Sequence, residues 1–161
     1  MLKKTLTLSD ALRLSGPLRF NMMFKPVGAM CNLGCSYCYY LDKVRFYDEH
    51  SYLPLDLLEK VIKEYIEIND SEQIVFDWHG GEPLLLGLDY FKKIVDIQRK
   101  YRGNKHIYNT IQTNATLLDS EFAVFFKENN FLVGVSIDGP QDVHDNFRKD
   151  KICHLVLYHD A

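Results

Sequence analysis

The sequence has no long apolar run, no excess of positive charge and no leader-like start. Its apolar stretches are short and interrupted by charged residues, so none reaches the roughly 20 apolar residues of a membrane-spanning helix. The 19 basic and 22 acidic side chains leave a net charge of −3, which offers no basic face to nucleic acid. Residues 1–10 lack the apolar core of a signal peptide. These absences predict a cytoplasmic chain that binds neither a membrane nor a nucleic acid.

Cysteine is scarce as well, because the chain has only four residues of this type. In a cytoplasmic protein, so few thiols are more typical of ligands than of a disulfide framework. Cys31, Cys35 and Cys38 have the spacing C-x3-C-x2-C, which lets one tight loop present three sulfurs. The fourth, Cys153, lies far along the chain. A [4Fe–4S] cluster usually takes four thiolates, so three would leave one iron open to a substrate or cofactor.

Spacing alone leaves two other interpretations of the cysteines open. A structural zinc ion could use two or three of these thiols, but it needs a fourth ligand to close the site. A redox-active Cys-x-x-Cys pair usually opens a helix and does not need a third cysteine. The spacing therefore favours an iron–sulfur site.

Strand-like apolar runs alternate with amphipathic, helix-like segments along a sequence that is 47% hydrophobic. The pattern predicts strands over residues 20–25, 73–78, 107–112 and 132–137, and helices over residues 55–68, 88–101 and 119–129. Strands and helices in alternation predict an α/β fold with a parallel sheet. Ligands bind beyond the carboxyl ends of such strands, and there the sequence places residues 31–38, 79–83, 113–114 and 138–140.

Two of these segments together resemble the radical SAM superfamily, where SAM is S-adenosylmethionine. They are Cys-x3-Cys-x-Tyr-Cys at residues 31–38 and Gly-Gly-Glu-Pro at residues 80–83. The flanking sequences resemble, more narrowly, the anaerobic sulfatase-maturating enzymes. They are Lys-Pro-Val-Gly-Ala-Met at 25–30, Tyr-Cys-Tyr-Tyr-Leu at 37–41, Trp-His at 78–79, Gln-Thr-Asn at 112–114 and Val-Ser-Ile-Asp-Gly-Pro at 135–140. The resemblance covers about residues 20–150.

The resemblance implies a partial TIM-like barrel, in which residues 20–150 form a radical SAM core of about four of the family's six βα units. Residues 1–19 would be an N-terminal extension, and residues 151–161 an atypical tail that suggests a truncated or frame-shifted product. The cofactors it implies are a [4Fe–4S] cluster on Cys31, Cys35 and Cys38 and a SAM that one-electron reduction cleaves to a 5′-deoxyadenosyl radical. Full-length members oxidise a Cys or Ser of a sulfatase polypeptide to Cα-formylglycine, with flavodoxin or ferredoxin as electron donor.

Individual roles also follow from the resemblance. Tyr37 matches the residue that lies against the SAM adenine, and Gly81 matches the backbone that holds the SAM amino group. Ser136 and Arg148 match positions that contact the polar end of SAM, where an arginine fork suits a carboxylate. Three further positions at this rim are His79, Asn114 near the ribose or in a plain turn, and Tyr40 facing the substrate or packed in the core.

The matched stretch leaves the catalytic step open. The proton-accepting aspartate and the auxiliary clusters of the family lie outside it, so no catalytic residue is assigned. We therefore expect these 161 residues alone to bind a cluster and cleave SAM slowly without making formylglycine. Two alternatives remain: another radical SAM peptide-modifying maturase, such as a thioether-forming enzyme, and a non-catalytic metal-binding remnant.

Overall fold

A single parallel sheet forms the centre of the fold in the computed structural model, which describes residues 17–46 and 52–151. The sheet order is β1-β2-β3-β4, with strands at Met22–Phe24, Gln73–Trp78, His106–Thr113 and Phe131–Val135. Consecutive strands are joined through the α-helices α2 (Leu55–Ile68), α3 (Leu88–Tyr101) and α4 (Ser120–Glu128). Helix α5 (Gln141–Phe147) follows β4, and the short 3-10 helices are η1 (Leu41–Phe46) and η2 (Pro83–Leu86). The predicted α/β fold with a parallel sheet is confirmed.

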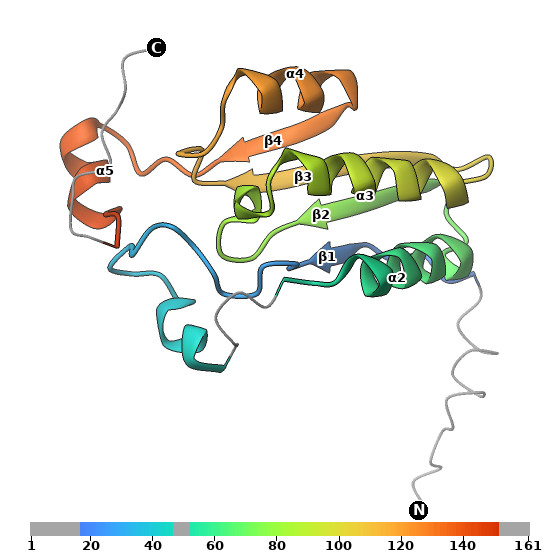
Figure 1. Ribbon diagram of the computed structural model, residues 1–161, viewed down its shortest axis with the longest axis horizontal. Coiled ribbons are helices and arrows are strands. Elements are labelled where there is room, and N and C mark those ends of the chain that lie inside the picture. The colour runs from blue at the N-terminus through green and yellow to red at the C-terminus, as the bar shows by residue number, and fades with distance from the viewer. Residues whose placement is uncertain (1–16, 47–51, 152–161) are drawn as a thin grey trace, which may run out of the picture.

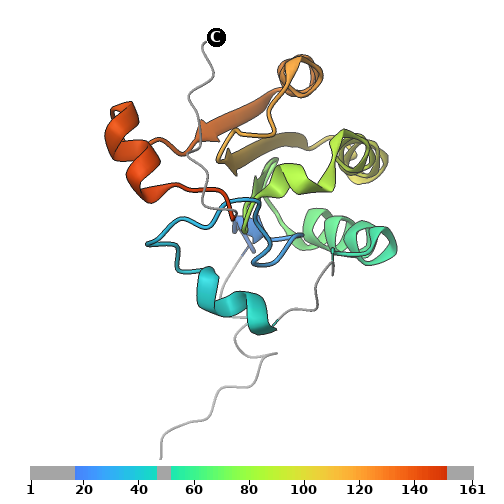
Figure 2. The same cartoon turned by 60° about the vertical axis from the view of Figure 1, so that its left-hand side comes forward.

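All three connecting helices cover the same face of the sheet. Figure 1 shows α2, α3 and α4 beside the strands, and Figure 2 shows them together along the right-hand side of the sheet. On the opposite face, Met23, Tyr108 and Leu132 are exposed. A sheet with sequential strand order and helices on one face has the arrangement of part of a (β/α) barrel. No helix in the described ranges is long and apolar enough to cross a membrane.

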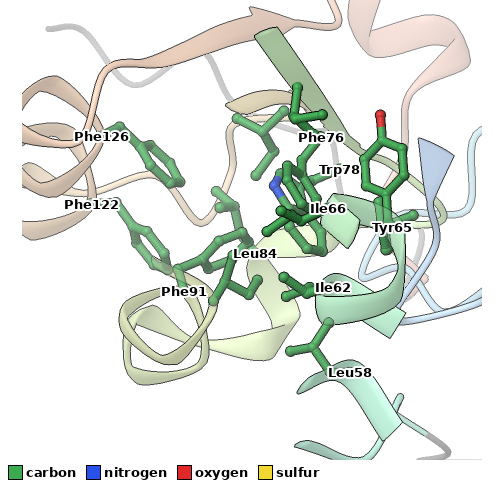
Figure 3. Packing of buried hydrophobic residues seen from close by; sticks show 14 residues of the cluster. Leu58, Ile62, Tyr65, Ile66, Phe76, Trp78, Leu84, Phe91, Phe122 and Phe126 are labelled. Carbon is green, nitrogen blue, oxygen red and sulfur yellow. The ribbon is translucent and has the colours of Figure 1, made fainter. Parts of the chain in front are cut away.

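The core lies between the sheet and these helices (Figure 3). Phe76 and Trp78 of β2 point toward α2, whose buried stripe is Leu58, Ile62, Tyr65 and Ile66. On α3, Phe91 packs edge-on against two rings of α4, with centroid separations of 6.1 Å to Phe122 and 5.6 Å to Phe126. Every second residue of a strand thus faces the helices, and the apolar stripe of each helix faces the sheet.

Helix α2, strand β2 and helix α3 have the predicted bounds, whereas two strands are shorter than predicted. Strand β1 does not include Phe20, because the Phe20 carbonyl accepts hydrogen bonds from the side chains of Tyr65 (3.1 Å) and Asn69 (2.6 Å). Strand β4 ends at Val135, which pairs with the last residue of β3. Helix α4 is one residue shorter at each end than the predicted 119–129, and it begins after Asp119, whose carboxylate caps it by accepting the Phe122 N–H at 2.9 Å.

Some sequence predictions fall on parts of the chain that the structure does not describe. Residues 1–16 of the predicted extension lie outside the described ranges, as do residues 152–161 of the predicted tail, including Cys153. Helix α5 is the one described α-helix that the apolar periodicity did not predict.

A buried polar network joins the sheet to α3. Asn109 of β3 accepts the indole N–H of Trp78 and an amide N–H of Gln98, both at 2.8 Å. Its own amide donates to Gln98 Oε1 at 2.9 Å. All three side chains are buried, so each hydrogen bond replaces one that water would otherwise make.

We predict that Asn109→Ala destabilises the fold by about 1–3 kcal/mol, because it leaves Trp78 and Gln98 with unpaired buried donors. The measurement is urea unfolding followed by the fluorescence of Trp78, the only tryptophan in the chain. Lys63→Ala is the control, because it breaks an exposed ion pair with Glu67 at 3.9 Å and a contact with the Tyr101 ring at 5.8 Å, each worth less than about 1 kcal/mol. Equal unfolding free energies for the two variants would contradict this role of Asn109.

Candidate functional site

Four loops meet beyond the carboxyl ends of the strands and enclose a cavity of about 220 Å³. They lie at the arrowhead end of the sheet in Figure 1. The structure brings together in this cavity every residue to which the sequence assigned a cluster or SAM role: Cys31, Cys35, Cys38, Tyr37, Gly81, Ser136 and Arg148. The rim candidates His79, Asn114 and Tyr40 line it too. A larger cavity of about 380 Å³ lies near the amino end of β3, between α3 and α4, and contains none of them.

The cysteines belong to the cluster loop, which we define as residues 25–38. Its first half turns tightly, with hydrogen bonds from Gly28 N to Lys25 O (2.9 Å) and from Met30 N to Val27 O (3.0 Å). Its second half is held by the chain after α5, since Gly34 N donates to Lys149 O at 2.7 Å. A one-residue antiparallel bridge between Leu33 and Asp150 continues this contact. The loop is therefore fixed by segments that are distant in the sequence.

Gly80 and Gly81 bring the loop after β2 into direct backbone contact with the cluster loop. Gly81 N donates to Gly28 O at 3.0 Å, and Glu82 N donates to Met30 O at 2.8 Å. A Cβ atom on Gly81 would lie 1.8 Å from Met30 O, which no side chain permits. Gly80 has a φ of +119°, which favours glycine. The pair thus has a packing role in addition to the SAM role that the resemblance assigns to Gly81.

Glu82 ties the loop after β2 to the end of β3. Its carboxylate is fully buried and accepts three hydrogen bonds, from Leu84 N (3.0 Å), Thr113 Oγ1 (2.7 Å) and Asn114 N (2.7 Å). Burial raises the pKa of Glu82, while the three donors act in the opposite direction. In the sequence, Glu82 stands out only as part of the Gly-Gly-Glu-Pro motif. The signal for its role was an acidic residue in an otherwise apolar and glycine-rich stretch.

The surroundings of the thiols fit an iron–sulfur cluster. Cys31 Sγ accepts hydrogen bonds from Leu33 N at 3.3 Å and from Asn114 Nδ2 at 3.6 Å. Burial raises the pKa values of Cys31 and Cys35, but these donors, and the Arg148 charge near Cys35, favour the thiolate that a metal needs. N–H donors to sulfur are also a known way in which proteins tune clusters.

A single zinc ion fits the described residues less well. Zinc holds thiolates at about 2.3 Å and so requires its ligands to converge on one point. In the described part of the chain, no group of three or more His, Cys, Asp or Glu side chains converges in this way. The three thiols instead line a shared cavity, which suits a larger metal group.

Asn114 is both a turn residue and a contact of the cluster loop. Its Oδ1 accepts the Thr116 N–H at 3.0 Å, which closes a short turn after β3. Its Nδ2 donates to Asn32 Oδ1 at 2.9 Å as well as to Cys31 Sγ. The end of β3 is thereby connected to the first cluster cysteine.

Arg148 and Tyr37 meet at Asp138. Arg148 donates from Nε and Nη2 to the two oxygens of Asp138, both at 2.9 Å, and Tyr37 Oη donates to the same carboxylate at 2.6 Å. The Arg148 guanidinium lies 5.7 Å from the centroid of the Tyr37 ring. Arg148 and then Tyr37 hold the pKa of Asp138 below its usual range. The arginine fork that the sequence analysis expected for a SAM carboxylate is therefore directed at Asp138.

Ser136 is held by Gln112 of β3. Gln112 Nε2 donates to Ser136 Oγ at 2.8 Å, and its side chain passes over Gly134, where a Cβ atom would lie 2.4 Å from Gln112 Oε1. His79 lines the cavity with a buried Nδ1 that has no hydrogen-bond partner in the described ranges. Burial and the nearby Lys25 charge lower the pKa of His79, which favours the neutral imidazole. Sequence reasoning missed Gln112 and Asp138 as individual residues, because only their side-chain contacts reveal their roles.

Comparison with known proteins agrees with this geometry. The family model of the Radical SAM superfamily matches residues 26–154. The chain is similar to the "Serine-type anaerobic sulfatase-maturating enzyme" of Bacteroides thetaiotaomicron, with 53% identity over 133 residues, which are 81% of this chain and 32% of that enzyme. It is also similar to the "Cysteine-type anaerobic sulfatase-maturating enzyme" of Clostridium novyi, with 40% identity over 134 residues, covering 81% of this chain and 35% of that enzyme.

A solved structure described as "Native anSMEcpe with bound AdoMet and Cp18Cys peptide" has a similar fold. It superposes with a TM-score of 0.75 at 38% sequence identity, covering 83% of this chain and 35% of that chain. The chain thus spans about a third of the length of the relatives that it matches.

We predict that Gly81→Ala destabilises the metal-free chain by about 1–3 kcal/mol, because the new methyl group meets backbone that cannot move aside. Gly34→Ala adds the same methyl group to the cluster loop, where its nearest neighbour lies at 3.9 Å. The unfolding free energy of this control should stay within about 1 kcal/mol of that of the parent. Urea unfolding of the three proteins provides the comparison, and equal stability of the two variants would refute the packing role of Gly81.

Proposed function

Since the chain belongs to the radical SAM superfamily, we propose that its cavity binds a [4Fe–4S] cluster and SAM, the cofactors that this family uses. The observation that carries the proposal is the shared cavity, which joins the three thiols to four further residues matched to SAM contacts. Residues 20–150 would form the radical SAM core, with residues 1–19 as an extension and residues 151–161 as a tail. We also propose a cytoplasmic location, where disulfides are rare and a small number of cysteines is more typical of metal ligands.

Different residues of the cavity would bind the cluster and SAM. Cys31, Cys35 and Cys38 would hold three irons of the cluster and leave the fourth open to SAM. Tyr37, whose ring is half-exposed, offers a flat apolar surface to the adenine. Gly81 presents peptide groups without a side chain in the way, as suits an amino group.

Ser136 and Arg148 would receive the polar end of SAM. The Ser136 hydroxyl is oriented by Gln112, and Arg148 retains a nitrogen, Nη1, that makes no hydrogen bond in the part of the chain that the structure describes. A single charged donor would thus meet the SAM carboxylate, in place of the fork expected from the sequence. A reduced cluster held by the three thiols would supply the electron for cleavage of SAM to methionine and a 5′-deoxyadenosyl radical.

For the protein as a whole, we propose a sulfatase polypeptide as substrate, with oxidation of a Cys or Ser to Cα-formylglycine. The support is the similarity to serine-type and cysteine-type enzymes of this activity, and to a solved structure that holds AdoMet together with a peptide. Tyr40 and His79 line the same cavity and would face that peptide. Flavodoxin or ferredoxin would be the electron donor.

We predict that anaerobic reconstitution loads about four irons per chain, in one cluster. Each of the substitutions Cys31→Ala, Cys35→Ala and Cys38→Ala should abolish iron loading, because two remaining thiolates hold a cluster too weakly. Cys153→Ala is the matched control and should load like the parent. Iron and sulfide assays measure the outcome. Stoichiometric zinc, together with no uptake of iron, would overturn the cluster proposal.

The reconstituted chain should cleave SAM to 5′-deoxyadenosine when a reductant is added, whereas a Cys35→Ala chain should not. A sulfatase-derived peptide should raise this rate above that of a scrambled peptide. Both Cys and Ser peptides are required, because relatives of both types match. Chromatography measures the nucleoside, and mass spectrometry should find no formylglycine in the peptide, as expected for these 161 residues alone. A cluster without any SAM cleavage would indicate a non-catalytic remnant, and a thioether product would indicate a different maturase.

A further inference from the structure

Asp138 touches both of the side chains that are matched to opposite ends of SAM, yet it is not among the described residues that line the cavity. It lies three residues beyond the end of β4 and precedes Gly139, whose φ of +113° turns the chain into α5. Its own N–H faces Nδ1 of the buried His144 in α5, at 3.4 Å. Asp138 is therefore anchored by its backbone and directs its carboxylate toward the cluster loop.

Both oxygens of this carboxylate are used. Oδ1 accepts Arg148 Nη2, and Oδ2 accepts both Arg148 Nε and Tyr37 Oη. The three residues come from the cluster loop, the loop after β4 and the chain after α5, and Tyr37 is 101 positions from Asp138. A bidentate pair fixes the plane of a guanidinium as well as its position. Two of the three Arg148 nitrogens are held in this way, so the direction of the third is set.

We propose that Asp138 is a positioning residue, which presents Arg148 Nη1 to the SAM carboxylate and orients the Tyr37 ring for the adenine. This inference rests on the SAM site proposed above. Asp138 itself contacts neither cofactor, and it acts by restricting two side chains that would otherwise sample several rotamers. Outer contacts of this kind are worth about 10–100-fold in affinity or activity where they have been tested around metal sites.

Charge and positioning make opposite predictions for Asp138→Asn. The substitution removes a negative charge beside Arg148, so simple Coulomb attraction would make the SAM carboxylate bind more tightly. The amide, however, places a donor against donors of Arg148 and breaks the bidentate pair. If Asp138 acts by positioning, SAM should bind more weakly despite the more favourable charge. The sign of the change therefore distinguishes the two effects.

The experiment is a titration of the reduced, reconstituted chain with SAM, followed by the electron paramagnetic resonance spectrum of the cluster. This signal reports a ligand on the open iron and is insensitive to stability alone. Asp138→Asn should weaken SAM binding about 10–100-fold at unchanged iron content. Asp142→Asn is the matched control, an exposed aspartate on α5 that does not line the cavity, and it should bind like the parent.

A double-mutant cycle adds the evidence that Asp138 acts through Arg148. Arg148→Lys should weaken SAM binding because a point charge cannot keep both the Asp138 contact and the ligand contact. The double variant Asp138→Asn, Arg148→Lys should then bind SAM no more weakly than the weaker single variant. Additive losses would mean that Asp138 acts elsewhere, and they would overturn the inference.

The remaining outcomes are also decisive. If the parent chain holds a cluster but shows no SAM effect, the proposed SAM site fails and this inference fails with it. If the parent binds SAM and Asp138→Asn binds it equally or more tightly, only the positioning role is refuted. If Asp138→Asn fails to fold or to hold its cluster, Tyr37→Phe decides. This variant removes a single hydrogen bond to Asp138 and should weaken SAM binding about 2–10-fold. An unchanged affinity for SAM would overturn the inference.

Discussion

The close approach of the Gly81 backbone to Met30 is the contact on which the arrangement of the cavity depends. It leaves no room for a side chain, and hydrogen bonds from Gly81 and Glu82 to the cluster loop maintain it. The buried Glu82 carboxylate then extends the same contact to the end of β3 through Thr113 and Asn114. Three of the four loops are thus joined without any cofactor, which is the condition for a site that is formed before its ligands arrive.

Glu82 and Asp138 are carboxylates at this end of the sheet with a structural role. Glu82 accepts only from this chain's own donors, and Asp138 is occupied by Arg148 and Tyr37. Neither lines the cavity in the described part of the chain, where thiols, rings, glycines, amides and hydroxyls surround the space together with Leu33 and the Arg148 guanidinium. Such a lining suits chemistry that the cofactors perform, with the protein supplying geometry.

Periodicity was sufficient to predict the sheet and helices where one face is buried. The stripe of Leu58, Ile62 and Tyr65 fixed the bounds of α2 because it packs on the core. The shorter β1 was not predictable, because it depends on Asn69 and Tyr65 taking the carbonyl of Phe20. Helix α5 was missed because its seven residues are mostly polar and bury only His144 and Asp145. A side chain's partner across the fold, such as Asp138 for Arg148, leaves no local pattern in the sequence.

The contact between the cluster loop and residues 147–150 also has a consequence for the order of assembly. Leu33 pairs with Asp150, and Asn32 bonds to Thr116, so the loop is completed by partners made long after it. Contacts between such distant residues form late in folding, since their loop-closure entropy must first be overcome. During translation, the three cysteines are made more than a hundred residues before Asp150, which pairs with Leu33 of their loop. The loop therefore reaches its final geometry only after residue 150 has been made, and any ligand that requires this geometry binds after that point.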